Sequence, residues 1–97
     1  IAGGRDIRCA PYATFGTRDL SDSILVALRD RKACLMANHG LICLEQSLPL
    51  ALRLAIEVEH LANAYRQSLE IGGPVLLDNE EMDRVVEKFR HYGPDAQ

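Results

Sequence analysis

The chain has 97 residues, enough for at most one domain, and its 47% hydrophobic and 26% charged content is that of a folded globular protein rather than a disordered one. A net charge of −3 with scattered Lys and Arg forms no basic stripe, so we expect no nucleic-acid partner. No apolar run approaches the ~20 residues that cross a bilayer, and the first residues do not resemble a secretory signal. We therefore expect a cytoplasmic protein with no membrane partner.

The three cysteines, Cys9, Cys34 and Cys43, show no CxxC spacing. Cys34 and Cys43 fall within apolar segments, where thiols usually pack as small hydrophobic side chains. We predict reduced thiols without a metal or redox role, as is usual in the cytoplasm.

Residues 1–16 are rich in Gly, Pro and small side chains, which predicts extended chain and loop. Thr17 then caps a helix whose apolar side chains share one face: Leu20, Ile24, Ala27 and Leu28. The runs "ACLMA" (33–37) and "LICL" (41–44) flank "NHG" and predict two buried strands joined by a tight connection. Because apolar residues are consecutive in both runs, we expect both faces of the strands to be covered.

A long helix is predicted over residues 48–71, opened by Ser47 and Pro49 and ended by "GGP". Its apolar side chains recur with helical period: Ala51, Leu54, Ala55, Val58, Leu61, Ala62, Tyr65 and Leu69. At ~1.5 Å per residue this helix would be about 35 Å long, the width of a small domain. A lone pair of strands is also marginal. We therefore expect further chain or other subunits to cover these elements.

The segment after Asp78 predicts a last helix that ends near "HYGP". Asp78 can cap its first turn, and Glu81 can reach back to the cap from three residues later. This helix is expected to bury its apolar side chains, Met82, Val85, Val86 and Phe89.

Of the three histidines, His60 lies off the apolar stripe of the long helix, which favours a surface position. His91 follows a helix C-terminus, where the helix dipole favours a histidine without any chemical role. His39 stands at the end of a predicted buried strand, where a rigid sheet can hold an imidazole in a fixed orientation. Asn38 and Gly40 beside it are also ordinary turn residues, and zinc needs three or four protein ligands. Local pattern alone leaves both a turn and a metal ligand open for His39.

Four segments, taken together, favour the metal ligand: "CAPYATFGT", "RKACLMANHGLIC", "ALRLAIEVEHLANAY" and "DNEEMDRVVEKFRHYG". In this order they closely resemble the second half of the class II aldolase/adducin family, and within it the fuculose-phosphate aldolases. The resemblance covers essentially all of residues 1–97 and implies that they are the C-terminal portion of a single domain. It implies an α/β fold with three α/β/α layers on a mixed, mostly antiparallel sheet.

The same resemblance implies site residues. The histidine of the family's "HG" motif is a zinc ligand and matches His39. The phenylalanine of "ATFGT" and the tyrosine of the C-terminal "YG" shape the aldehyde side of the site and match Phe15 and Tyr92. The other ligands, a His-x-His pair, and a catalytic glutamate and tyrosine precede Ile1 in the family pattern. One imidazole would then not hold zinc tightly, so we expect the 97-residue chain alone to be inactive.

The function that the resemblance implies is a zinc-dependent lyase, a homotetramer with sites at its subunit interfaces. It would cleave a sugar phosphate, L-fuculose 1-phosphate or a similar one, to dihydroxyacetone phosphate and an aldehyde. The alternatives are a pentulose-5-phosphate 4-epimerase or dehydratase of the same superfamily, or a non-catalytic adducin-like binding module. "PYATFGT" favours the aldolase, and retention of His39 argues against the binding module.

Overall fold

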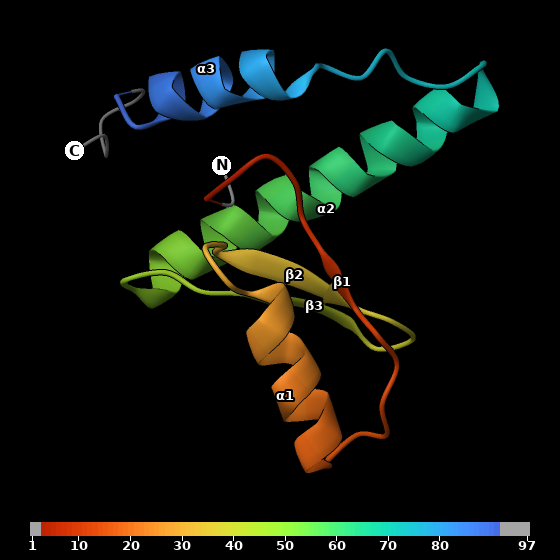
Figure 1. Ribbon diagram of the computed structural model, residues 1–97, viewed down its shortest axis with the longest axis vertical. Helices are drawn as coiled ribbons and strands as arrows, with labels where there is room; N and C mark the ends of the chain where they lie inside the picture. Colours follow the sequence, from red (N-terminus) through yellow and green to blue (C-terminus); the bar gives the residue numbers. More distant parts are fainter. Residues whose placement is uncertain (1–2, 92–97) are drawn as a thin grey trace.

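The computed structural model describes residues 3–91, in which two helices cover opposite faces of a small sheet and a third helix follows near the C-terminal end (Figure 1). In chain order the elements are β1 (Cys9–Ala10), α1 (Arg18–Ala27), β2 (Ala33–Met36), β3 (Gly40–Cys43), α2 (Leu48–Glu70) and α3 (Asn79–Phe89). The helix and hairpin predictions are confirmed to within a few residues. None of the helices in this described range is long and apolar enough to cross a membrane.

The sheet is mixed, with the strand order β1-β2-β3. β2 and β3 form the predicted antiparallel hairpin, in which Ala33 lies opposite Cys43. β1 runs parallel to β2, with Cys9 opposite Leu35. The sequence missed β1 as a strand, because it has only two residues and its pairing is with a segment 26 positions along the chain.

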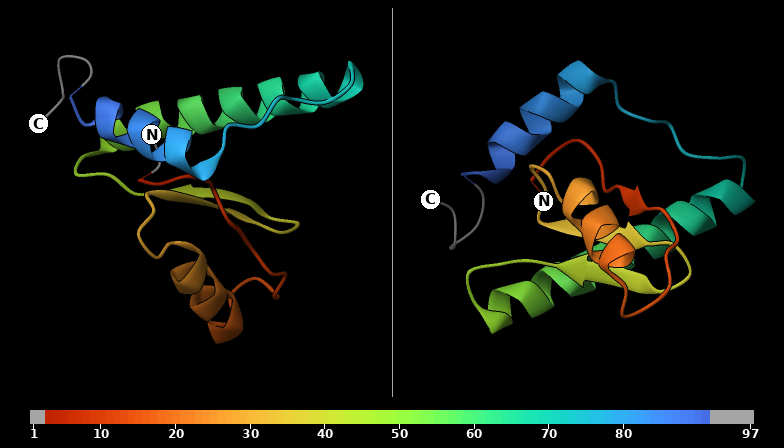
Figure 2. Two further views of the ribbon diagram at one scale, coloured as in Figure 1. Left: turned by 45° about the horizontal axis from the view of Figure 1, so that its top comes forward. Right: turned by 60° about the horizontal axis from the view of Figure 1, so that its bottom comes forward.

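Both faces of the sheet are covered, as the consecutive apolar residues predicted. Ala33 packs with Leu54 and Val58 of α2, whereas the next residue, Cys34, packs with Ala10 and with Ala27 of α1. Successive side chains of a strand point to opposite faces, so one run of apolar residues serves two cores. Figure 2 shows the resulting order of layers, α2, sheet and α1. This is the three-layer α/β/α fold, here as part of a domain.

The three helices start at the predicted caps. The side-chain oxygens of Thr17, Ser47 and Asp78 accept hydrogen bonds from backbone N–H groups in the first turns of α1, α2 and α3. These bonds satisfy N–H groups that have no partner within the helix. Glu81 does not complete the predicted reciprocal bond to the cap, because its carboxylate pairs with Arg84 (Oε2 to Nε, 3.0 Å).

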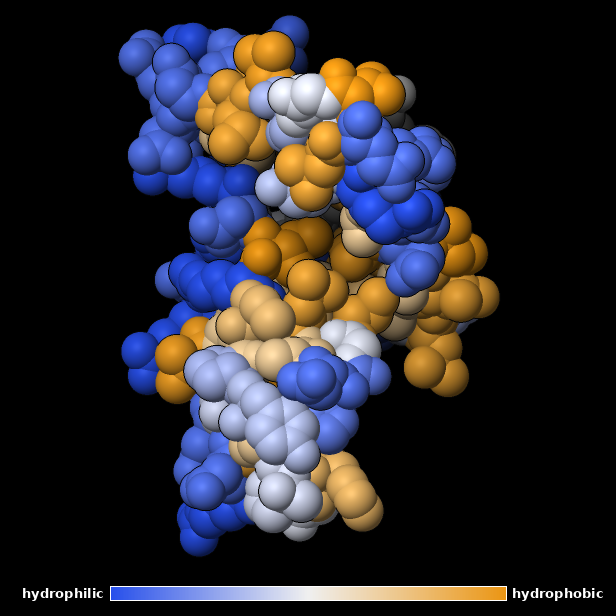
Figure 3. Space-filling model, turned by 90° about the vertical axis from the view of Figure 1, so that its right-hand side faces the viewer, coloured by the Kyte–Doolittle hydropathy of each residue, from blue (hydrophilic) through white to orange (hydrophobic). Residues whose placement is uncertain are grey.

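The second half of α2 and the whole of α3 are less buried than predicted. Leu54 and Val58 are buried, but Tyr65 and Leu69 further along α2 are 52% and 54% exposed. α3 has no fully buried residue: Met82, Val85 and Val86 are half-buried and Phe89 is 40% exposed, so its predicted apolar face is buried only in part. The reason is geometric: α2 extends past the end of the sheet, as Figure 1 shows. Apolar side chains consequently remain on the surface (Figure 3).

Candidate metal-ligand site at the β2–β3 turn

His39 is the last residue of the tight turn that joins β2 to β3, rather than part of a buried strand. The turn closes with a hydrogen bond from the backbone N–H of His39 to the carbonyl of Met36 (3.0 Å). Asn38, its third residue, has a φ of 68°, and Gly40 follows with a φ of 148°. A positive φ at the third position of a turn favours Gly or Asn. The sequence "NHG" therefore folds locally in the way that presents His39 at the tip of the hairpin.

Two groups from the loop after β1 hold the imidazole of His39. Its Nε2 lies 2.8 Å from the backbone carbonyl oxygen of Ala13. A carbonyl only accepts hydrogen bonds, so Nε2 carries the proton, and in the neutral ring Nδ1 then has the free lone pair. The ring of Tyr12 stacks on the imidazole with 5.5 Å between centroids and 16° between planes. An exposed side chain thus has a defined orientation.

The loop that carries Tyr12 and Ala13 is fixed at both ends. At its start, the carbonyl of Ala10 accepts from the backbone N–H of Ala37 (3.1 Å), which ties β1 to the turn. At its end, the hydroxyl of Thr17 donates to the carbonyl of Thr14 (2.6 Å) while it caps α1. The sheet and the helix N-terminus therefore position the loop against His39.

Two other residues are predicted for the site, Phe15 and Tyr92. Phe15 lies in the same loop, two residues beyond Ala13, with its side chain 78% exposed. Tyr92 lies outside the described residues. Tyr12, which contacts His39 directly, was missed by the sequence analysis. The signal was present, since Tyr12 belongs to the "PYATFGT" segment, but only the fold shows which of its side chains meets the turn.

The remaining titratable side chains do not add metal ligands. Within residues 3–91, no group of three or more His, Cys, Asp or Glu side chains is close enough to hold a metal ion. Burial raises the pKa of the Cys34 and Cys43 thiols, which favours their protonated, apolar form. His60 is exposed, and His91 lies 3.5 Å from the exposed carboxylate of Glu87.

His39 itself suits a metal-binding role. Histidines that bind metals usually donate their second ring N–H to a carbonyl or carboxylate, which fixes the tautomer and the ring orientation. The Ala13 carbonyl provides this interaction. The described residues thus supply one well-oriented ligand, and a complete site would need others.

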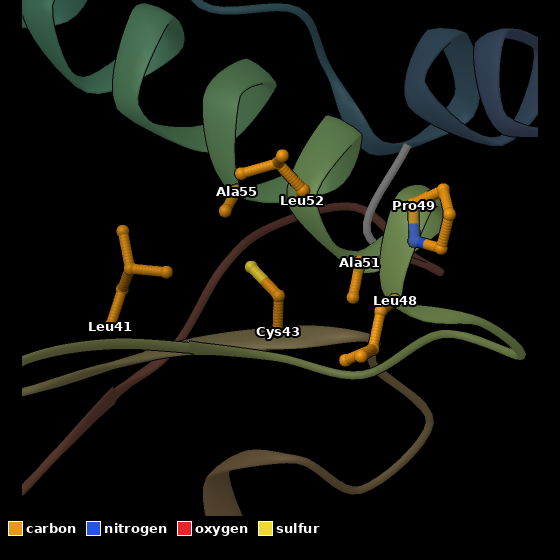
Figure 4. A pocket seen from close by; sticks show the side chains of 7 residues that line it. All are labelled: Leu41, Cys43, Leu48, Pro49, Ala51, Leu52 and Ala55. Atoms are coloured by element: carbon orange, nitrogen blue, oxygen red, sulfur yellow. The ribbon is translucent and has the colours of Figure 1, made fainter.

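A second concave feature is an apolar groove of ≈ 670 Å³ between β3 and the start of α2 (Figure 4). Its lining is Leu41, Cys43, Leu48, Pro49, Ala51, Leu52 and Ala55. β3 is also an edge strand. The backbone N–H of Leu44 donates to the carbonyl of Lys32 (2.7 Å), so these two residues form a hydrogen-bonded pair. In an antiparallel pair of strands, every second residue makes such bonds. Cys43 and Leu41 therefore turn their backbone N–H and C=O groups away from β2. The groove therefore borders an open, apolar sheet edge, which has no chemistry of its own.

Comparison with known proteins places these features in context. The sequence profile of the family described as "Class II Aldolase and Adducin N-terminal domain" matches residues 1–66. The 5-methylthioribulose-1-phosphate/5-deoxyribulose-1-phosphate aldolase of Rhodospirillum rubrum is 52% identical over 97 residues, which cover 100% of this chain and 44% of the relative. The L-fuculose phosphate aldolase of Escherichia coli (strain K12) is 55% identical over 93 residues, 95% of this chain and 43% of the relative.

The fold agrees with the sequence comparison. A solved structure of L-fuculose 1-phosphate aldolase superimposes with a TM-score of 0.86 at 41% identity, over 90% of this chain and 41% of that one. The chain thus spans less than half the length of the relatives it matches.

Proposed function

Because the chain belongs to the class II aldolase and adducin family, we propose that the complete protein, with the whole family domain, is a metal-dependent aldolase acting on a sugar phosphate. The observation that carries the proposal is the imidazole of His39, fixed by the Ala13 carbonyl at 2.8 Å at the tip of an ordered hairpin. An orientation set by a backbone carbonyl is characteristic of metal-ligating histidines. We assign His39 as one zinc ligand.

A zinc ion held by His39 and by ligands from the rest of the domain would act as a Lewis acid that stabilises negative charge on the substrate as a carbon–carbon bond breaks. The residues of this chain would help to hold the metal ion and to orient its ligand. In its neutral form His39 would present the Nδ1 lone pair, and the Ala13 carbonyl would keep that tautomer fixed. Phe15 and Tyr92 are assigned to the aldehyde side of the site, where they would contact the departing aldehyde.

The proposed substrates are ketose 1-phosphates, cleaved to dihydroxyacetone phosphate and an aldehyde. The relatives support this class, since they are named for L-fuculose phosphate and for 5-methylthio- and 5-deoxyribulose 1-phosphates. A 5-deoxy or 5-methylthio sugar carries an apolar group at its far end. The exposed ring of Phe15 is suited to such a group.

We propose that the remainder of the domain covers the open edge of β3 and the apolar groove beside it. Leu41 and Cys43 offer both unpaired backbone groups and apolar side chains there, which is what an added strand needs. Residues 1–97 are then the C-terminal portion of one domain. The exposed apolar side chains of α2 and α3 support further burial in a homotetramer. Three free thiols suit a cytoplasmic location.

The test is release of dihydroxyacetone phosphate by the purified complete protein. L-Fuculose 1-phosphate and 5-deoxyribulose 1-phosphate are offered separately, and the product is measured through NADH oxidation by glycerol-3-phosphate dehydrogenase. We expect release from at least one of them and its loss after metal chelation. The 97-residue chain alone should release none.

Other outcomes separate the alternatives. Bound metal without product from either sugar, together with epimerisation of a pentulose 5-phosphate or loss of water from a substrate, would contradict the aldolase and favour the epimerase or dehydratase. Neither metal nor product would favour an adducin-like binding module.

A further inference from the structure

Tyr12 has an environment that a simple packing role does not explain. Its side chain is 59% exposed and belongs to neither hydrophobic core of the fold. Within residues 3–91 its ring is stacked on one aromatic partner, the imidazole of His39, with the planes 16° from parallel. Its hydroxyl has no hydrogen bond to another described residue. The interaction of Tyr12 is therefore made by the face of the ring.

The two contacts of the imidazole constrain different motions. The bond from Nε2 to the Ala13 carbonyl fixes the direction in which the ring points. It leaves the ring able to swing about the Cβ–Cγ bond, a torsion with broad energy wells in histidine. The parallel ring of Tyr12 opposes that swing, because rotation would remove the stacked contact or force the rings together. Direction and plane are thus set by consecutive residues of one loop.

We infer that Tyr12 is a positioning residue for the metal ligand His39, acting through the face of its ring. This inference rests on the proposed function, because that function assigns the oriented imidazole as a zinc ligand. A ligand held in one orientation binds metal more tightly than one that must be ordered on binding. Tyr12 would not touch the metal or the substrate, and its hydroxyl would be dispensable.

The experiment compares two variants of Tyr12 in the complete protein. Tyr12→Ala removes the stacked ring, and Tyr12→Phe keeps the ring but removes the hydroxyl. The zinc dissociation constant is measured by competition with a chromophoric chelator. We expect Tyr12→Ala to weaken zinc binding by about tenfold, the lower end of the range for groups that orient a metal ligand, and Tyr12→Phe to stay within about twofold of the wild type.

A metal-free measurement tests the geometry directly. In the apo protein with 15N-labelled histidine, the wild type should show His39 as the Nε2–H tautomer, as the 2.8 Å bond to Ala13 requires. Tyr12→Ala should broaden or shift the His39 ring signals, and Tyr12→Phe should restore them. His60→Ala is the control, since it removes another exposed ring, which lies on α2 off its apolar face and away from the turn.

Each result has a defined meaning. Wild-type zinc affinity and unchanged His39 signals in Tyr12→Ala would overturn the inference, as would a Tyr12→Phe variant as weak as Tyr12→Ala. If Tyr12→Ala fails to fold, Tyr12→Leu replaces it, because leucine fills space without a ring face. Failure of the proposed function looks different: the wild type itself would then bind no metal, or His39→Ala would bind it unchanged.

Discussion

Arg5 and Asp83 are 78 residues apart in the sequence and form a bidentate ion pair that joins the start of the chain to α3. Nε and Nη2 of Arg5 each lie 2.9 Å from one carboxylate oxygen of Asp83. Since α3 has no fully buried residue, this pair is a principal link between α3 and the remainder of the described chain. The paired geometry distinguishes it from an ordinary surface ion pair.

The ion pair makes a prediction about pH. The hydrogen bond and charge of Arg5 lower the pKa of Asp83 below its ordinary value of 3.8. A carboxyl whose pKa is lower in the folded protein stabilises it above the unfolded pKa and loses that contribution as the pH falls through the folded one. The 13C chemical shift of the Asp83 carboxyl should therefore titrate below pH 3.8. In Arg5→Gln the midpoint should move up.

Arg66→Gln is the matched control, since Arg66 pairs with Glu70 within one helix, and this substitution should leave the Asp83 midpoint unchanged. An Asp83 midpoint that does not respond to Arg5→Gln would show that the ion pair is absent in solution.

For single residues, the sequence predicted the features that depend on neighbouring positions in the chain. The helix caps Thr17 and Asp78 and the turn at "NHG" follow from residue types within four positions, and the structure has all of them. The stacking of Tyr12 on His39 was not predictable in this way, because 27 positions separate the two rings and only the parallel pairing of β1 with β2 brings them together. The role of His39 as a zinc ligand stays a prediction.

At the scale of elements, the sequence predicted the faces of α1 and the hairpin but overestimated the burial of α2. Helical period identifies which residues can share an apolar face, and it does not say how far the facing surface extends. Leu54 and Val58 lie over the sheet and are buried, whereas Leu69 lies beyond it and is 54% exposed. The strand β1 was missed because two residues carry no period at all.

The burial of α2 predicts the effect of a substitution. Val58 is 2% exposed and packs with Ala33 and Leu54, so Val58→Ala would leave a small cavity between α2 and the sheet. We expect it to lower the free energy of unfolding of the complete protein by about 2 kcal/mol, measured by urea denaturation. Val26→Ala is the matched control in α1, where the side chain is 54% exposed, and it should cost less than about 0.5 kcal/mol. Equal losses in the two variants would contradict this placement of the core.

For the molecule as a whole, the chain superimposes on only 41% of the larger solved structure that it matches. The open edge of β3, the ≈ 670 Å³ groove beside it and the exposed second half of α2 are surfaces that a stable domain covers. The length of the long helix and the strands that are apolar on both faces lead us to expect cover from further chain or other subunits, and this stays a prediction. The sequence could not indicate what would cover which surface, because helical period and composition carry no information about such contacts.

The assignment of His39 as a zinc ligand is tested most directly by the metal content of the complete protein and of two histidine variants. His39→Ala removes the proposed ligand, and His60→Ala removes an exposed imidazole on α2. After dialysis at a fixed free-zinc concentration, zinc per protein chain is measured by inductively coupled plasma mass spectrometry, with circular dichroism to verify the fold. We expect about one zinc per chain in the wild type and in His60→Ala, and a loss of at least tenfold in zinc affinity in a folded His39→Ala. Equal zinc in His39→Ala and the wild type, or no zinc in the wild type, would contradict the assignment.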